Sequence, residues 1–274
     1  MYKLIACDLD ETLLSDDTHV CQRNRDAIMK LQQLGVKFVL ATGRGYISVQ
    51  NTLKELNLAQ QENEYVISFN GACISENKNN HVLNFNGLEH QQAQKLYQYG
   101  QNYDVCMHVY TKDMVYVYNM DEDERNYMSG RHAYKEIDTD NLDFLKTEDI
   151  AKVLYQNTDQ EYLHMLAESM GELGDQFDIS YSSNRYLEFN KKGVNKGEGL
   201  IWLAQQLKIK PEETIAMGDN INDLSMITRA GLGVGMQNSN PAIKPYCDYI
   251  TEADNNNGGV AEAIEKFVLA DRRG

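Results

Sequence analysis

The chain has 274 residues, of which 42% are hydrophobic and 24% charged, a composition typical of a globular protein and not of a disordered or fibrous one. Its 41 acidic and 26 basic residues give a formal charge of −15. No block of Lys and Arg is present that could gather the phosphates of a nucleic acid, so DNA and RNA are poor candidates as partners. The length allows a core with an inserted module, and we expect two units.

The cysteines and the N-terminus indicate a soluble protein of the cytoplasm. The five cysteines form no CxxC pair and leave one residue over in any disulfide scheme, which favours a reducing compartment. The segment "MYKLIACDLD" turns acidic within ten residues, unlike a signal peptide, and no apolar run approaches the ~20 residues of a membrane span. The six histidines are scattered singly, so a zinc site has no support.

The first part of the chain reads as alternating strands and helices. Strands are predicted at residues 2–7, 36–42 and 65–70, and the apolar spacing between them predicts helices up to Gly35 and around 49–56. This βαβαβ order implies a parallel sheet with right-handed crossovers.

The pattern of hydrophobic and polar residues changes after about residue 75, where a polar connector begins. Residues 106–119 resemble a hairpin, residues 161–173 a helix, and residues 177–190 two short strands around a Ser-Ser-Asn turn. We interpret this middle portion as an α+β module of antiparallel strands.

The alternating pattern then returns. Asn195 and Glu198 form a capping-box-like helix start, followed by strands at 214–219 and 231–236, a short helix between them, and a closing helix at 259–270. The predicted fold class is α/β, a Rossmann-like parallel-sheet core formed by residues 1–84 and 191–274. The inserted α+β cap domain is predicted at 85–190.

Four predicted core strands end in polar residues. In an open parallel sheet the carboxyl ends of the strands meet at the edge where ligands bind. A single Asp or Asn at such a place is often only a turn residue, but four such ends together indicate a site. The residues in question are Asp8 and Asp10, then Thr42, Gly43 and Arg44, then Asn70 and Gly71, then Gly218, Asp219, Asn222 and Asp223.

Acids gathered at one edge require a cation, because like charges raise each other's pKa. Oxygen ligands in small number suit Mg²⁺ better than Ca²⁺ or Zn²⁺. A calcium loop starting at Asp8 would need Gly and Glu where the chain has Leu13 and His19.

With a bound Mg²⁺, Asp8 can stay ionised and attack a phosphoryl group, as in enzymes that form aspartyl-phosphate. Asp10 can then pass a proton to the leaving oxygen and serve as general acid and base. The Thr42 hydroxyl and the Gly43 amide suit phosphoryl oxygens. Lys196 opens a predicted helix and can add a fixed positive charge, although an ordinary surface lysine is the alternative.

Four segments, "DLDETLL", "ATGR", "VNKGEGL" and "GDNINDLSM", look in this order and spacing like the four motifs of the haloacid dehalogenase superfamily phosphatases. The insertion between the second and third motifs, together with "SFNGA" at 68–72, resembles the Cof-type subgroup with its large α/β cap. Each motif is weak alone, whereas four in register are specific.

The resemblance implies a role for each matching residue. Asp8 would be the nucleophile and Asp10 the acid/base. Mg²⁺ would be bound by Asp8, by the main-chain carbonyl of Asp10 and by Asp219, while Asp223 would support the metal's water shell. The substrate phosphate would be bound by the amide of Leu9 and by Thr42, Gly43, Lys196 and Asn222. Asn70 and Gly71 would line the substrate pocket. Glu11 departs from the pattern, since many members have Gly there, and an inward-pointing carboxylate would disturb Asp10.

The inserted module is expected to close over the active edge and to set specificity. Arg185 and Glu188 are our candidates for the substrate pocket, with ordinary strand-face residues as the alternative. Arg44 is a further pocket candidate that could instead pair with a surface acid. The acidic segment at 120–125 is interpreted as a helix start or a solvated face, and we assign no chemistry to it.

The sequence therefore predicts a cytoplasmic, Mg²⁺-dependent phosphatase that cleaves a small phosphorylated metabolite, with sugar phosphates as the leading class. A phosphomutase or phosphotransferase, a phospho-receiver without turnover, and a binding protein that has lost catalysis are the alternatives. The physiological ester and the oligomeric state, monomer or weak dimer, stay open at this stage.

Overall fold

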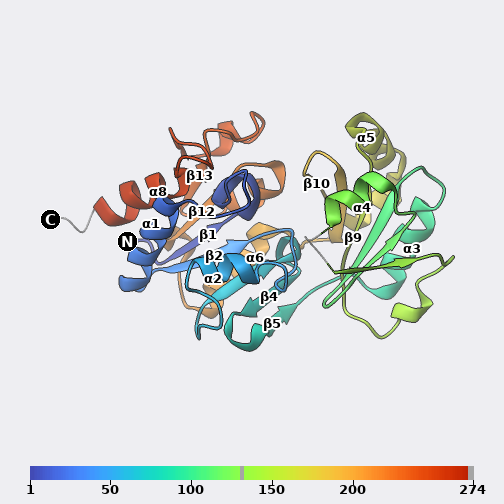
Figure 1. Cartoon of the computed structure of the whole chain (residues 1–274), viewed down its shortest axis with the longest axis horizontal. Coiled ribbons are helices and arrows are strands. Elements are labelled where there is room, and N and C mark those ends of the chain that lie inside the picture. Colours follow the sequence, from blue (N-terminus) through green and yellow to red (C-terminus); the bar gives the residue numbers. More distant parts are fainter. Residues whose placement is uncertain (130–132, 271–274) are drawn as a thin grey trace. The chain divides into compact units, whose positions relative to one another are not determined.

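The computed structural model describes residues 1–129 and 133–270 (Figure 1). The chain divides into two compact units. Met1–Asn84 and Asn195–Gly274 form the first, and Phe85–Val194 forms the second. The second unit is thus an insertion, because the chain leaves the first unit once and returns to it once.

An eight-stranded sheet forms the centre of the first unit, with the order β14-β13-β12-β1-β2-β3-β4-β5. Its strands are β1 (Leu4–Cys7), β2 (Lys37–Ala41), β3 (Tyr65–Ser68), β4 (Cys73–Glu76), β5 (His81–Phe85), β12 (Thr214–Gly218), β13 (Leu232–Gly235) and β14 (Tyr249–Ile250). The strands from β14 to β3 are parallel, whereas β4 is antiparallel to β3. The order reverses between β1 and β12, and this is where an open α/β sheet has its binding crevice.

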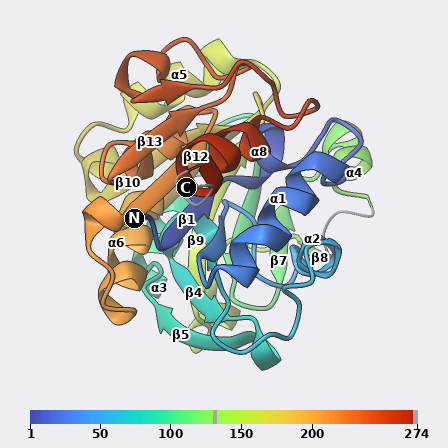
Figure 2. The ribbon, with the colours of Figure 1, turned by 90° about the vertical axis from the view of Figure 1, so that its left-hand side faces the viewer.

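Helices on the two faces of the sheet explain why its central strands are apolar on both sides. These helices are α1 (Gln22–Gln33), α2 (Gln50–Glu55), α6 (Lys196–Gln206), α7 (Leu224–Ile227) and α8 (Gly259–Ile264). Leu200 and Leu203 of α6 pack in one buried cluster with Leu4, Ala6 and Val39. The alternate strand residues are buried as well, and α1 contacts both β2 and α8, as Figure 2 shows for the helix pair.

A six-stranded sheet with the order β10-β11-β9-β6-β7-β8 forms the second unit. Its elements are α3 (His90–Gly100), β6 (Cys106–Thr111), β7 (Val115–Tyr118), α4 (Glu122–Met128), β8 (Tyr134–Ile137), β9 (Ile150–Gln156), α5 (Gln160–Ser169), β10 (Phe177–Ser182) and β11 (Tyr186–Lys191). Leu96 of α3 and Leu163 of α5 pack with Val109, Val153 and Phe189 in one buried cluster. Because side chains alternate along a strand, His108 and Tyr110 belong to the opposite face of this sheet.

The α/β fold class with a Rossmann-like core is confirmed, as are the hairpin at 106–119 and the strands at 177–190. The polar connector predicted after residue 75 is wrong, because it contains the end of β4 and the whole of β5. β5 lies at the sheet edge with largely exposed side chains, so it lacks the hydrophobic alternation that marks a half-buried strand.

The prediction for the middle portion missed α3, β8 and β9, and its antiparallel pattern is broken where β8 runs parallel to β7. The helix predicted to reach residue 173 ends at Ser169, since Gly171 adopts a positive φ of 49°. The strand predicted at 65–70 ends at Ser68, because Phe69 and Asn70 turn with positive φ. No helix in the described part of the chain is long and apolar enough to cross a membrane.

Gly71 lies in the loop after β3, where the backbone passes very close to Asn195 at the start of α6. Its φ is 98°, and a Cβ there would lie 2.3 Å from the carbonyl oxygen of Asn195. Gly35 also has a positive φ, 71°, but no atom lies within 4 Å of its hypothetical Cβ. We expect Gly71→Ala to lower the free energy of unfolding by about 3 kcal/mol, and Gly35→Ala by about 1 kcal/mol. Urea unfolding followed by circular dichroism measures both, and equal losses would contradict the close approach at Gly71.

Candidate active site

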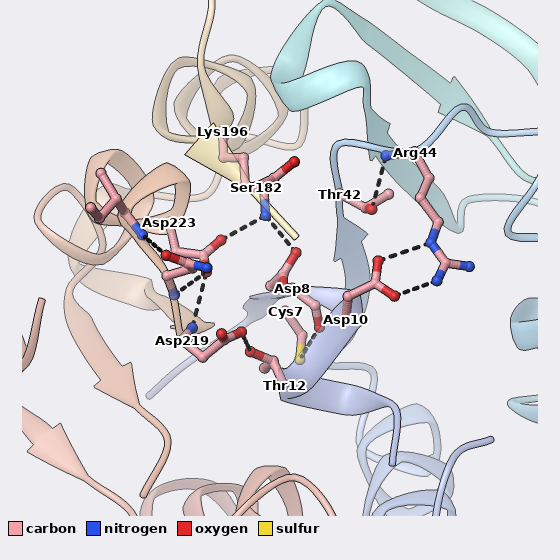
Figure 3. A network of polar contacts seen from close by, with 12 residues as sticks. Cys7, Asp8, Asp10, Thr12, Thr42, Arg44, Ser182, Lys196, Asp219 and Asp223 are labelled. Atoms are coloured by element: carbon pink, nitrogen blue, oxygen red, sulfur yellow. Dashed lines mark hydrogen bonds and ion pairs between the residues drawn. The ribbon is translucent and has the colours of Figure 1, made fainter. Parts of the chain in front are cut away.

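The functional candidates of the first unit lie at the carboxyl edge of its parallel strands. Asp8 follows β1, Thr42 follows β2, the turn Phe69–Gly71 follows β3 and Asp219 follows β12. Figure 3 shows Asp8, Lys196, Asp219 and Asp223 pointing toward one another from three separate segments. The sheet topology brings these segments together, although their residues are far apart in the sequence.

Three carboxylates form the centre of this edge. One oxygen each of Asp8, Asp219 and Asp223 lies within 4.8 Å of the other two. The exposed fractions of the three residues are 7%, 4% and 0%. Three acids so close and so buried repel each other strongly unless a cation compensates them.

Lys196 supplies part of that compensation. Its Nζ atom lies 2.5 Å from Asp8 Oδ1 and 2.6 Å from Asp223 Oδ1, and its side chain is fully buried. The Asn195 side chain accepts a hydrogen bond from the Glu198 amide and caps α6, which fixes Lys196 as the first helical residue. The predicted alternative of an ordinary surface lysine is therefore wrong.

The pKa values at this site show that Lys196 alone does not compensate the three buried carboxylates. Burial raises the pKa of Asp8 to about 7, with Asp223 adding to the rise and Lys196 opposing it. Burial likewise raises the pKa of Asp219 to about 9, with Asp8 and Asp223 adding to it. Burial acts to lower the pKa of Lys196, but the carboxylates of Asp223 and Asp8 outweigh it and hold that pKa above its ordinary value.

Asp223 and Thr12 hold the loops of the site in place. Asp223 Oδ2 accepts hydrogen bonds from the amides of Asp219 and Asn220, both at 3.0 Å. Thr12 donates to Asp219 Oδ1 at 2.5 Å from the turn that follows β1. The sequence analysis missed Thr12, whose only signal was a hydroxyl four residues beyond Asp8 in the same turn.

The donor set fits a hard divalent cation. In residues 1–129 and 133–270, Asp8 and Asp219 each have one carboxylate oxygen that accepts a hydrogen bond, Oδ1 in both cases, which leaves Oδ2 for a metal. Both oxygens of Asp223 are already engaged, so its carboxylate is better suited to bind metal-bound water than the metal itself. Buried carboxylates with raised pKa values are the groups that a bound cation would keep ionised.

Asp10 is placed differently from the three carboxylates. Its side chain is 49% exposed and forms an ion pair with Arg44, whose Nε donates to Asp10 Oδ2 at 2.9 Å. Arg44 therefore pairs with an acid, one of its two predicted alternatives, although that acid belongs to the candidate site. Glu11 adopts a positive φ of 58° and its side chain is exposed. This conformation accounts for the Gly that many members of the resembled family have here.

The remaining core candidates lie around this centre. Leu9, Thr42, Asn70 and Gly71 are buried, whereas Gly43 and Asn222 are half-buried. The amide of Asn70 donates to the carbonyl oxygen of Thr42 at 2.9 Å, which ties the loops after β2 and β3 together. Their predicted contacts with a phosphate or a leaving group stay predictions.

Arg185 and Glu188 lie in the second unit and are engaged there. Arg185 Nη2 lies 2.5 Å from Asp123 Oδ2 and 2.7 Å from Glu124 Oε2, and Glu188 is paired with Lys152. Of the two interpretations of residues 120–125, the acidic helix start is confirmed by α4, whereas a solvated face is wrong at Glu124, which is fully buried. Both pocket candidates thus have a structural role in the unit, and their contact with a substrate stays a prediction.

Comparison with known proteins agrees with this geometry. The sequence matches the family of haloacid dehalogenase-like hydrolases over residues 5–264. YxeH of Bacillus subtilis, which bears a provisional phosphatase name, is 34% identical over 275 residues, covering 98% of this chain and 100% of the relative. The 5-amino-6-(5-phospho-D-ribitylamino)uracil phosphatase YcsE of Bacillus subtilis is 29% identical over 272 residues, 97% of this chain and 96% of the relative.

A solved structure gives the same result. The haloacid dehalogenase-like hydrolase from Bacteroides thetaiotaomicron matches with a TM-score of 0.82 at 30% identity, covering 97% of this chain and 99% of its own. The chain belongs to the haloacid dehalogenase-like hydrolases, which confirms the resemblance carried by its four motifs. It is a hydrolase that acts on phosphate esters.

Replacing Lys196 should reveal the repulsion that it offsets. Lys196→Met leaves two buried carboxylates without a counter-charge, and we expect a loss of about 3–5 kcal/mol in the free energy of unfolding of the metal-free protein. The control is Lys3→Met, which removes an exposed ion pair with Glu213 and should cost less than about 1 kcal/mol. Urea unfolding in a chelator measures both, and similar losses would contradict a compensating role for Lys196.

The metal-free protein should lose stability as the pH rises. The folded-state pKa of Asp8, about 7, and of Asp219, about 9, both exceed the ordinary value of 3.8. A carboxyl group with a raised pKa contributes stability that is fully present below its unfolded pKa and is lost as the pH rises through its folded pKa. We therefore expect the melting temperature in a chelator to fall as the pH rises from about 4 to about 9.

Asp219→Asn should weaken this pH dependence, because it removes the group whose pKa is raised furthest toward alkaline pH. Asp140→Asn, at an exposed carboxylate of the second unit, should leave the dependence unchanged. A profile that is the same in all three proteins would show that the carboxylate cluster does not govern it.

Proposed function

We propose that this protein is a Mg²⁺-dependent phosphatase that hydrolyses small phosphomonoesters through an aspartyl-phosphate on Asp8. The observation that carries the proposal is the cluster of Asp8, Asp219 and Asp223 around Lys196 at the carboxyl edge of the sheet. A nucleophilic carboxylate must be desolvated enough to attack and must still be ionised. The cluster meets both conditions once a cation is bound.

Asp8 and Asp219 would hold Mg²⁺ through their carboxylates, together with the main-chain carbonyl of Asp10, while Asp223 would hold its water shell. The haloacid dehalogenase superfamily generally uses this ion, and its preference for oxygen ligands suits the donor set. When bound, Mg²⁺ neutralises charge on the phosphoryl oxygens and on Asp8, which lets two anions approach each other.

In the first step an oxygen of Asp8 attacks phosphorus, and the bond from phosphorus to the ester oxygen breaks. Asp10 gives a proton to the departing oxygen, so that an alcohol leaves instead of an alkoxide. The Lys196 ammonium, the Thr42 hydroxyl, the amides of Leu9 and Gly43 and the side chain of Asn222 are proposed to bind the phosphoryl oxygens.

In the second step water attacks the same phosphorus atom. Asp10, now deprotonated, accepts a proton from that water, and the bond between phosphorus and Asp8 breaks. Inorganic phosphate is released, and both carboxylates return to their starting states. The same residue thus acts first as acid and then as base.

The proposed substrate is a small phosphorylated metabolite with a sugar or polyol leaving group. One relative, YcsE, is named for a substrate in which phosphate sits on a ribityl chain, which supports this class. We propose that the second unit is a cap that selects the leaving group. Asn70 and Gly71 of the first unit and Arg185 and Glu188 of the second are the residues proposed to contact the substrate. We also propose a cytoplasmic location, supported by the absence of disulfides among the five cysteines.

Asp8→Asn should abolish turnover without unfolding the protein, because an amide cannot attack phosphorus and the side-chain volume is unchanged. The measurement is Mg²⁺-dependent release of inorganic phosphate from a panel of sugar, polyol and nucleoside phosphates. We expect the loss to exceed about 10³-fold on every substrate that the wild type cleaves. Thermal unfolding of both proteins is the control for folding.

Four outcomes would contradict the proposal. Full activity of Asp8→Asn would exclude the nucleophile, and activity unchanged by a chelator would exclude the metal. Phosphoryl transfer to a second sugar in place of water would identify a phosphotransferase. A stable phospho-protein without multiple turnovers would identify a receiver.

A further inference from the structure

We propose that Arg44 is a positioning residue that fixes the Asp10 carboxylate for its role as general acid and base. The inference rests on the proposed function. Arg44 Nε donates to Asp10 Oδ2 at 2.9 Å, and Nη2 of the same guanidinium pairs with Oδ1, so one planar group holds both oxygens (Figure 3). Such a fork fixes the orientation of a carboxylate as well as its position.

The Asp10 carboxylate depends on Arg44 for this orientation. In the part of the chain that the structure describes, residues 1–129 and 133–270, only Arg44 gives hydrogen bonds to that carboxylate. The Asp10 side chain is 49% exposed, so packing does not restrict its rotamers either. A carboxylate without the fork would sample several orientations, and few of them would face a leaving oxygen.

The backbones on both sides of the pair are themselves anchored. The Arg44 amide donates to the Thr42 hydroxyl at 3.1 Å, and the Arg44 carbonyl accepts from the Phe69 amide at 3.0 Å. Beyond Asp10, the Glu11 carbonyl accepts from the Asn238 side chain at 2.8 Å. Arg44 therefore links the loop after β1 to the loop after β2, and both ends of the link are held by other segments.

The ion pair with Arg44 still allows Asp10 to donate and accept a proton. Each carboxylate oxygen has a second lone pair besides the one that faces Arg44, and this second site can carry the proton that the leaving group receives. A guanidinium does not itself deprotonate in a protein, so it cannot replace Asp10 as the acid. The role of Arg44 is thus to position Asp10, and its contribution should be largest where proton donation matters most.

Leaving groups of different basicity test this role. p-Nitrophenyl phosphate releases a weakly basic phenolate that needs little protonation, whereas glycerol 3-phosphate releases a strongly basic alkoxide. We expect Arg44→Gln to lower kcat on glycerol 3-phosphate by about 10²-fold and on p-nitrophenyl phosphate by less than about threefold, with KM nearly unchanged on both. Arg44→Lys, which keeps the charge without the fork, should fall between Arg44→Gln and the wild type.

Asp10→Asn should show the same contrast between the two substrates, and the double variant should be no worse than Asp10→Asn alone, because the two residues act as one unit. The control is Arg23→Gln, which breaks an Arg–Glu ion pair with Glu265 away from the site and should leave both activities unchanged. Equal losses on both substrates, or a rise in KM as the main effect, would overturn the proposal and indicate direct phosphate binding by Arg44. Additive losses in the double variant would overturn it as well.

A spectroscopic measurement tests the pair without turnover. In ¹⁵N-labelled protein the Arg44 Nε–H signal, assigned by its loss in Arg44→Gln, should shift in Asp10→Asn and stay in place in Arg23→Gln. An unchanged signal in Asp10→Asn would overturn the proposal whatever the kinetics show. If wild type and Arg23→Gln release phosphate from neither substrate nor from any member of the metabolite panel, the proposed function fails, and a shifted signal would still show that the ion pair exists.

Discussion

The crowding of negative charge at one edge of the sheet is the constraint on which the rest of this structure depends. Three buried carboxylates share a space in which, among the residues that the structure describes, Lys196 is the one buried cation that pairs with two of them. Their repulsion is strong because burial removes the water that would screen it. Burial, with repulsion from the neighbouring carboxylates added to it, raises the pKa of Asp8 to about 7 and that of Asp219 to about 9. The divalent cation proposed above would compensate this charge.

The backbone around the site is specialised in the same way. Glu11, Phe69 and Asn70 all have positive φ, a conformation that costs free energy for residues other than Gly. These residues lie in the turns after β1 and β3, where Asp10 and the loop next to α6 are placed. Hydrogen bonds between the loops hold the turns in this conformation, so the rest of the first unit supplies the free energy that the strained residues cost. Catalytic groups held in advance need no reordering when a substrate arrives.

The second unit shows that polar residues on a strand do not by themselves identify a binding site. Arg185 pairs with Asp123 and with the fully buried Glu124, which also accepts a hydrogen bond from Tyr186 at 2.6 Å, and Glu188 pairs separately with the buried Lys152. Such a network rigidifies a sheet face when each member has a partner. Membership of the haloacid dehalogenase-like hydrolases indicates the chemistry of the first unit, whereas a shared fold does not by itself define the leaving group.

The sequence by itself determined the parallel core, its strand order up to β3 and the identity of Asp8, Lys196 and Asp219, because these depend on local hydrophobic runs and on short motifs. It failed at β5, whose edge position leaves no hydrophobic alternation, and at α3, β8 and β9 in the insertion. Only the tertiary structure decided that Thr12 bonds to Asp219, that Arg44 pairs with Asp10 and that Glu124 is buried. Each of these facts depends on which distant segments of the chain lie next to each other in the folded protein. Burial and pairing therefore follow from tertiary contacts and cannot be inferred from the residue type alone.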